Sequence, residues 1–109
     1  MMKILNEIAN ERIRQDEKWG EQNHSLSLWL AILGEEFGEV SKEVVEFYFA
    51  KAKSSLSTKS ETYGMQSDEN NMLQRLILEN YRKELIQVAA VCVSMIESLE
   101  RNELSYFKN

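Results

Sequence analysis

The chain has 109 residues, of which 43% are hydrophobic and 28% are charged, and its formal net charge is −5. This composition predicts one soluble globular domain over residues 1–109, and the acidic balance argues against a protein that grips nucleic acid. The chain opens on a charged amphipathic segment rather than a signal peptide, and no apolar stretch is long enough to cross a membrane. We therefore expect a cytoplasmic protein with no membrane partner.

The first predicted element is an amphipathic helix over residues 2–18, because apolar residues such as Ile4 and Ile8 recur on one side of it. A loop over residues 19–25 is expected to follow. Gly20 can end the first helix, since glycine adopts left-handed backbone conformations easily. Ser25 or Ser27 can cap the next helix with its hydroxyl group.

Two long helices are predicted beyond this loop, because the chain has no proline and only four glycines. The first covers residues 26–53, where apolar positions alternate steps of three and four. Residues 54–69 are rich in polar side chains and lose this periodicity, so we expect a flexible polar loop. The last helix covers residues 70–102, either as one helix or broken near residue 80.

The last helix is apolar on most sides over residues 88–96, so it needs more neighbours than one three-helix chain supplies. This pattern predicts an all-α fold, an antiparallel helical bundle that is completed by oligomerisation into a homodimer or homotetramer. Cys92, the single cysteine, is expected to be a small buried core residue. The segment 104–107 either docks on a partner subunit or frays.

The most informative feature is a set of acidic residues on the predicted packing faces of two helices. Glu36, Glu39 and Glu43 follow one another at helical spacing within an apolar stripe. Glu84 and Gln87 repeat the three-residue step on the last helix. Desolvating carboxylates costs several kcal/mol per ion unless a cation compensates, so the pattern predicts a metal site inside a helical bundle.

Magnesium is the expected ion, with manganese as an alternative. Mg²⁺ prefers oxygen ligands, and proteins usually hold it with a few carboxylates together with substrate phosphates. Such an ion neutralises a polyphosphate and orients a water molecule for in-line attack on phosphorus. A spare carboxylate can then act as the general base.

Two stretches of the chain resemble the MazG-like all-α nucleoside triphosphate pyrophosphohydrolases, whose usual pattern is EExxE followed, after a spacer, by ExxD. The first stretch is GEEFGEV at residues 34–40, and the second is ELIQVAA at residues 84–90. The upstream segment at residues 11–24 is similar to the short MazG-like proteins often found in phage and prophage genomes. The resemblance covers residues 10–50 and 80–101.

This resemblance implies Mg²⁺-dependent hydrolysis of a ribo- or deoxyribonucleoside triphosphate to the monophosphate and pyrophosphate, as nucleotide-pool house-cleaning. By position it implies that Glu36, Glu39 and Glu84 are catalytic metal ligands and that Gln87 is a further ligand. Glu35 or Glu43 would assist as an outer-shell group or base. The chain departs from the family twice, because Gln87 replaces the usual aspartate and weakens the metal site, and because the spacer is longer.

Other residues are candidates for substrate contact. Trp19 either stacks on a base or plugs the helix junction, and His24 either contacts phosphate or ribose or is solvated. Lys18 and Arg82 are candidates to meet phosphate oxygens. Gln87 also keeps open a non-catalytic nucleotide- or metal-binding module, or a helical interaction module, with the same fold. A third hypothesis is a structural bundle with ion-paired glutamates, and no residue indicates a base or sugar preference.

Overall fold

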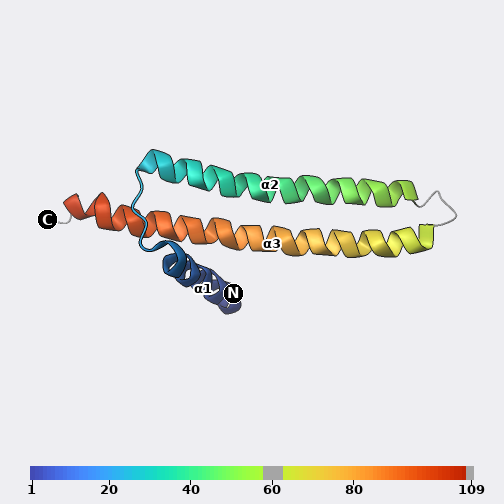
Figure 1. Ribbon diagram of the computed structural model, residues 1–109, viewed down its shortest axis with the longest axis horizontal. Helices are drawn as coiled ribbons and strands as arrows, with labels where there is room; N and C mark the ends of the chain where they lie inside the picture. The colour runs from blue at the N-terminus through green and yellow to red at the C-terminus, as the bar shows by residue number, and fades with distance from the viewer. Residues whose placement is uncertain (58–62, 108–109) are drawn as a thin grey trace. The chain divides into compact units, whose positions relative to one another are not determined.

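The computed structural model describes residues 1–57 and 63–107, with side chains over 1–53 and 68–107, and all regular elements in this part are helical (Figure 1). The α-helices are α1 (Met2–Trp19), α2 (Leu26–Ser57) and α3 (Tyr63–Asn102), and the 3₁₀-helix η1 (Leu104–Phe107) follows them. The predicted all-α fold is confirmed. None of the helices in the described ranges combines the length and the apolar character that crossing a membrane requires.

The ends of the first two helices form where the sequence predicts them. Gly20 has a φ of 72°, and its amide donates to the carbonyl of Asp16 at 2.8 Å, which closes α1. A left-handed φ is the conformation that glycine adopts without strain. At the start of α2, the hydroxyl of Ser25 accepts a hydrogen bond from the amide of Leu28 at 3.2 Å. Ser25 is therefore the capping residue, as one of the two alternatives predicted.

The connection between α2 and α3 is shorter than the loop predicted over residues 54–69. Residues 54–57 belong to α2 and residues 63–69 belong to α3, while residues 58–62 lie outside the described residues. The break considered near residue 80 does not occur, since α3 runs through it. Loss of apolar periodicity therefore does not mark the end of a helix in a segment without proline.

The chain divides into two compact units, and α2 and α3 contribute residues to both. Unit 1 comprises Met1–Phe37 and Leu85–Asn109, and unit 2 comprises Gly38–Glu84. The buried apolar side chains among the described residues are Trp29, Ala90 and Val91 in unit 1 and Ala50 and Ile77 in unit 2.

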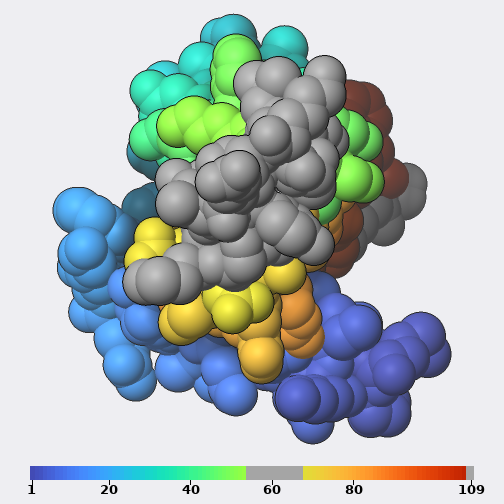
Figure 2. Space-filling view, turned by 90° about the vertical axis from the view of Figure 1, so that its right-hand side faces the viewer, coloured from blue at the N-terminus to red at the C-terminus, as the bar shows by residue number. Residues whose placement is uncertain are grey.

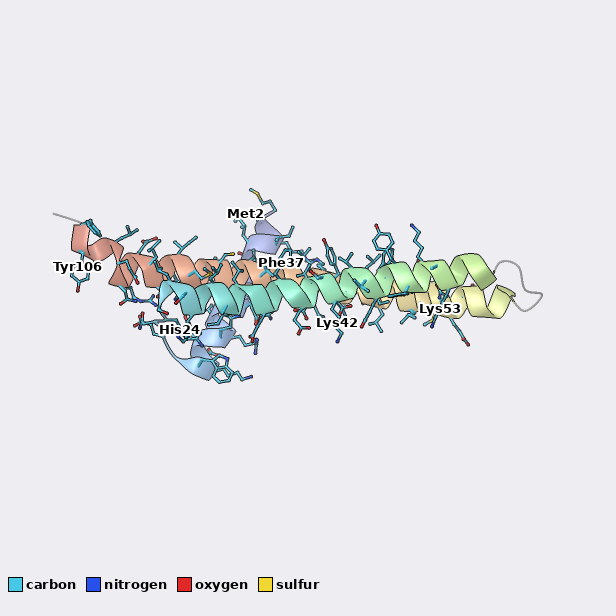
Figure 3. All side chains as sticks on the ribbon, turned by 90° about the horizontal axis from the view of Figure 1, so that it is seen from above. Met2, His24, Phe37, Lys42, Lys53 and Tyr106 are labelled. Atoms are coloured by element: carbon cyan, nitrogen blue, oxygen red, sulfur yellow. The ribbon has the colours of Figure 1, made fainter. Side chains whose placement is uncertain are left out.

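Both units expose large apolar side chains. Phe37 of unit 1 is 65% exposed and Phe49 of unit 2 is 67% exposed. In η1, Tyr106 is 84% exposed, and Figure 3 labels it there. Cys92, expected in the core, is only half-buried. Exposed apolar side chains of this size can pack against a partner where they lie together in one patch.

Candidate functional site

Three glutamates of unit 2 form what we term the acidic cluster: Glu39 and Glu43 on α2, and Glu84 on α3. Glu43 and Glu84 are half-buried, whereas Glu39 is exposed. Burial raises the pKa of the Glu84 carboxyl, the negative charges of Glu39 and Glu43 raise it further, and Lys42 acts in the opposite direction. The negative charges of Glu39 and Glu43 on α2 therefore act on Glu84 of α3, while Glu39, which was predicted to lie on a packing face, is exposed.

One oxygen of the cluster lacks a partner. Among the described side chains, Oε2 of Glu43 is buried and makes no hydrogen bond. Glu43 also lines a cavity of about 300 Å³ whose other walls are apolar or aromatic: Val44, Phe47, Tyr48, Leu78 and Tyr81. A buried carboxylate oxygen without a donor is costly, so this position favours a cation or a donor that the described side chains do not provide.

The corresponding carboxylate of unit 1, Glu11 on α1, is fully partnered. Arg14 donates to its two oxygens from Nε at 2.8 and 2.9 Å and also from Nη2. These bonds lower the pKa of Glu11, burial opposes the shift, and a hydrogen bond from Gln87 adds to the lowering. Glu11 is thus stabilised as an anion without any metal.

Gln87 ties α3 to α1. Its side-chain oxygen accepts a hydrogen bond from Nε2 of Gln15 at 3.2 Å, while its amide group bonds to Glu11. Figure 2 shows the blue atoms of α1 against the orange atoms of α3. An amide meets both demands, because it can donate to a carboxylate and accept from another amide. An aspartate at residue 87 would instead bring a second negative charge to Glu11.

Unit 1 contains a cavity of about 400 Å³, which we term the unit 1 cavity. It combines aromatic rings with amide, hydroxyl and charged groups, the mixture that binds small polar ring compounds. Its walls come from α1, the connection at residues 20–25, α2 and α3. They are formed by Arg14, Gln15, Trp19, Gln22, His24, Trp29, Ile32, Glu36, Gln87, Val91 and Ser94.

Several predicted site residues meet at the unit 1 cavity. Glu36 and Gln87 are half-buried there, and Trp19 and His24 form part of its wall. Trp19 is 62% exposed, so it does not plug the helix junction. The ring of His24 packs edge-on against Trp29 with centroids 4.8 Å apart, so His24 is not simply solvated.

The remaining predicted residues do not join either group. Lys18 is exposed and places its ammonium 4.8 Å from the ring centroid of Trp19, where it forms a cation–π contact. Glu35 is exposed on α2, and Arg82 is exposed on α3 in unit 2. None of these three lines the unit 1 cavity or is among the groups that shift the pKa of Glu84.

The acidic cluster suits a divalent ion by the chemistry of its oxygens but not by the grouping of its residues. Its carboxylate oxygens, and Glu43 Oε2 above all, are donors of the type that Mg²⁺ prefers. Over the described side chains, however, no three His, Cys, Asp or Glu residues are grouped so that they could hold a metal ion. The donors therefore fit the ion chemically, while the carboxylates are near enough to repel without forming a complete ligand set.

Sequence reasoning missed the contacts that join α1 to α3 in unit 1. Arg12 has a side chain only 14% exposed and bonds from Nη2 to Glu97 at 2.9 Å and to Asp16 at 3.0 Å. The four-residue step from Arg12 to Asp16 is visible in the sequence, and so is the three-residue step from Glu11 to Arg14. Neither step reveals the partner on α3, because that partner depends on how the helices pack.

Comparison of the chain with protein-family models, with curated proteins and with solved structures finds no match.

Proposed function

We propose that this protein is a cytoplasmic, Mg²⁺-dependent nucleoside triphosphate pyrophosphohydrolase that works in nucleotide-pool house-cleaning. The observation that carries the proposal is the acidic cluster, in which an oxygen of Glu43 is buried without a hydrogen-bond partner among the described side chains, and in which burial and the charges of Glu39 and Glu43 raise the pKa of Glu84. A structural bundle gains nothing from such an arrangement, because each desolvated charge destabilises the fold. A bound divalent cation would attract these carboxylates, so the same charges would then stabilise the fold.

In this proposal Glu39 and Glu84 hold the ion together with the phosphate oxygens of the substrate, which is the usual way that proteins bind Mg²⁺. Mn²⁺ can replace Mg²⁺. When bound, the ion would supply positive charge to the triphosphate and a site that orients the attacking water. The buried Oε2 of Glu43, to which no side chain of the described ranges donates, suits a general base that accepts the proton of that water.

The unit 1 cavity has the chemistry that the nucleoside part of a substrate needs. The exposed ring of Trp19 offers a face for a base to stack on, which is worth roughly 1–3 kcal/mol per base in comparable sites. The amides of Gln15 and Gln22 provide donors and acceptors beside it. Hydrogen-bonding groups next to an aromatic face are what distinguish a nucleobase from a simple apolar ligand.

We further propose that the helices form an antiparallel bundle completed by assembly into a homodimer or homotetramer. Support comes from the exposed apolar side chains of both units, Phe37 and Phe49 among them. Assembly would bury these side chains. Sedimentation velocity at several protein concentrations measures the assembly state directly.

The catalytic proposal is tested by pyrophosphate release from a panel of ribo- and deoxyribonucleoside triphosphates, with Mg²⁺ or Mn²⁺. Glu39→Gln and Glu84→Gln should each reduce the rate roughly 100-fold or more, since each removes a charge that offsets the ion. Glu46→Gln is the matched control, because Glu46 is exposed on the same helix as Glu39 and carries the same charge. Equal rates in the cluster variants and the control would contradict the proposal.

The second candidate is a non-catalytic nucleotide- or metal-binding module with the same fold. Gln87 favours it, because its amide is occupied by Glu11 and Gln15. The incomplete grouping of metal-binding residues in the described part of the chain points in the same direction. Titration calorimetry separates the two candidates: heat on adding nucleotide and Mg²⁺, without any pyrophosphate, identifies the binding module.

A further inference from the structure

We propose that Arg101 and Asn102, at the C-terminal end of α3, are positioning residues that hold the connection at residues 20–25 as one wall of the unit 1 cavity. The connection carries Gln22 and His24, which line that cavity. This inference rests on the proposed function for the identity of the ligand, and it goes beyond that function by naming what fixes the ligand-facing wall.

The connection has no regular secondary structure, so other contacts must order it. Arg101 supplies most of them from a single guanidinium group. Its Nη2 donates to the carbonyl of Gln22 at 3.1 Å and to Oδ1 of Asn23 at 3.0 Å, and its Nε donates to the same Oδ1 at 3.1 Å. Nε also lies 3.3 Å from a carboxylate oxygen of Glu21. Three consecutive residues of the connection are therefore held by one side chain.

Asn102 extends this contact into the core of unit 1. Its amide nitrogen donates to Oδ1 of Asn23 at 2.8 Å and to the hydroxyl of Ser98 at 3.3 Å. The same hydroxyl accepts a hydrogen bond from Nε1 of Trp29 at 3.1 Å. Ser98 and Trp29 are 1% and 2% exposed, so the connection is anchored to a rigid buried pair.

The anchored Trp29 in turn supports His24, whose ring meets it edge-on. Figure 3 labels His24 beside the start of α2. At the other end of the connection, Gly20 has the left-handed φ of 72° that ends α1. The backbone between these two points is short, so fixing Asn23 and Gln22 fixes which way His24 and the Gln22 side chain face. Loss of the Arg101 fork should leave α3 intact and loosen only this wall.

Two substitutions at Arg101 separate positioning from charge. Arg101→Lys keeps the positive charge near Glu21 but cannot reproduce three directed N–H bonds, since an ammonium group lacks the planar fork of arginine. Arg101→Gln removes the charge as well. Arg75→Gln is the matched control, because Arg75 lies on the same helix, has a side chain 84% exposed and pairs with Glu79, four residues along that helix.

Hydrogen exchange of the backbone amides at residues 21–25 is the first measurement. We expect exchange about tenfold faster in both Arg101 variants than in the wild type, with the amides of α3 and the control unchanged. Asn23→Ala, which removes the shared acceptor from the opposite side, should give the same pattern. Unchanged exchange in Arg101→Lys would overturn the proposal.

Nucleotide kinetics are the second measurement. For the best substrate of the triphosphate panel, the Arg101 variants should raise KM about tenfold while kcat stays within about twofold, because the wall orients substrate and takes no part in the chemistry. Faster exchange with an unchanged KM would also overturn the positioning role. If no triphosphate is hydrolysed, the proposed function fails, and nucleotide binding then tests the positioning role. Binding is measured by the quenching of tryptophan fluorescence with the same nucleotides. Equal affinities in the wild type and all variants would overturn the inference.

Discussion

Two half-buried carboxylates, Glu11 in unit 1 and Glu84 in unit 2, lie in opposite electrostatic environments. Glu11 receives hydrogen bonds from Arg14 and from Gln87, which lower its pKa. The pKa of Glu84 is raised by burial and by two neighbouring glutamates, with only Lys42 acting against them. The difference shows that burial of an acid is not by itself a sign of function, because one of these two acids is simply a structural partner.

The same contrast extends to the polar groups around each residue. In unit 1 the buried hydroxyl of Ser98 accepts bonds from Trp29 and Asn102, so its polar core is satisfied. In unit 2 a buried oxygen of Glu43 has no donor among the side chains that the structure describes. Natural folds satisfy nearly all buried polar groups, and the exceptions concentrate where a ligand or ion belongs. Unit 2 is therefore the part of the molecule whose stability should respond to a cation.

The largest effect should come from breaking the satisfied core of unit 1. Trp29→Ala removes a side chain that is 2% exposed and leaves the hydroxyl of Ser98 with one donor fewer. We expect a loss of about 3–5 kcal/mol in the free energy of unfolding, measured by urea titration. Leu30→Ala is the control, because Leu30 is 65% exposed on the same helix, and it should change stability by less than about 0.5 kcal/mol.

Local signals in the sequence account for most of the helix boundaries. Gly20 and Ser25 end and start helices through contacts with residues only a few positions away, and such contacts can be read directly from the chain. Helical spacing predicted that Glu39 and Glu84 lie on packing faces, and this prediction was only partly right. The charge of Glu39 does reach Glu84, but Glu39 itself is exposed, and Glu36 is not among the groups that shift the pKa of Glu84.

The sequence could not reveal how α1 packs. Gln87 was predicted to be a metal ligand because of its register with Glu84, yet the structure places its amide between Glu11 and Gln15. Those partners lie far away in the sequence, Gln15 by 72 positions, and no local pattern encodes them. The clamp formed by Arg101 on the connection was missed for the same reason, since an exposed arginine near a helix end has many ordinary roles.

Mg²⁺ should produce the next largest effect, and it should act through unit 2. Binding to the folded state alone raises the free energy of unfolding by about 1.4 kcal/mol at ten times Kd and by about 2.7 kcal/mol at one hundred times Kd. Glu84→Gln and Glu43→Gln should each abolish most of this gain in a thermal-shift titration. Glu11→Gln should retain it, so an equal loss in all three variants would remove the distinction between the two units.

Substitution of the two acids without metal should change stability in opposite directions. Glu11→Gln weakens the bonds from Arg14 and places an amide against Gln87, so we expect a loss of about 1 kcal/mol in the free energy of unfolding. Glu84→Gln relieves repulsion from Glu39 and Glu43, so we expect a gain of about 0.5 kcal/mol. Both changes are to be measured by urea titration with a chelator present. A change in the free energy of unfolding of the same sign in both variants would contradict the comparison.

The smallest effect is the pH dependence of these differences, and it should fall on opposite sides of the ordinary glutamate pKa of 4.5. Because the pKa of Glu11 is lowered in the folded state, its stabilisation is present above pH 4.5 and is lost as the pH falls through the lowered value. Because the pKa of Glu84 is raised, its protonated form is favoured on folding. The stability that this form provides is present below pH 4.5 and is lost as the pH rises through the raised value. The free-energy difference between wild type and Glu11→Gln should therefore change below pH 4.5, and that for Glu84→Gln should change above it, in metal-free urea titrations from pH 3 to 7. If the two free-energy differences change over the same pH range, both acids lie in the same kind of environment. The distinction between Glu11 as a structural acid and Glu84 as a functional one would then fail.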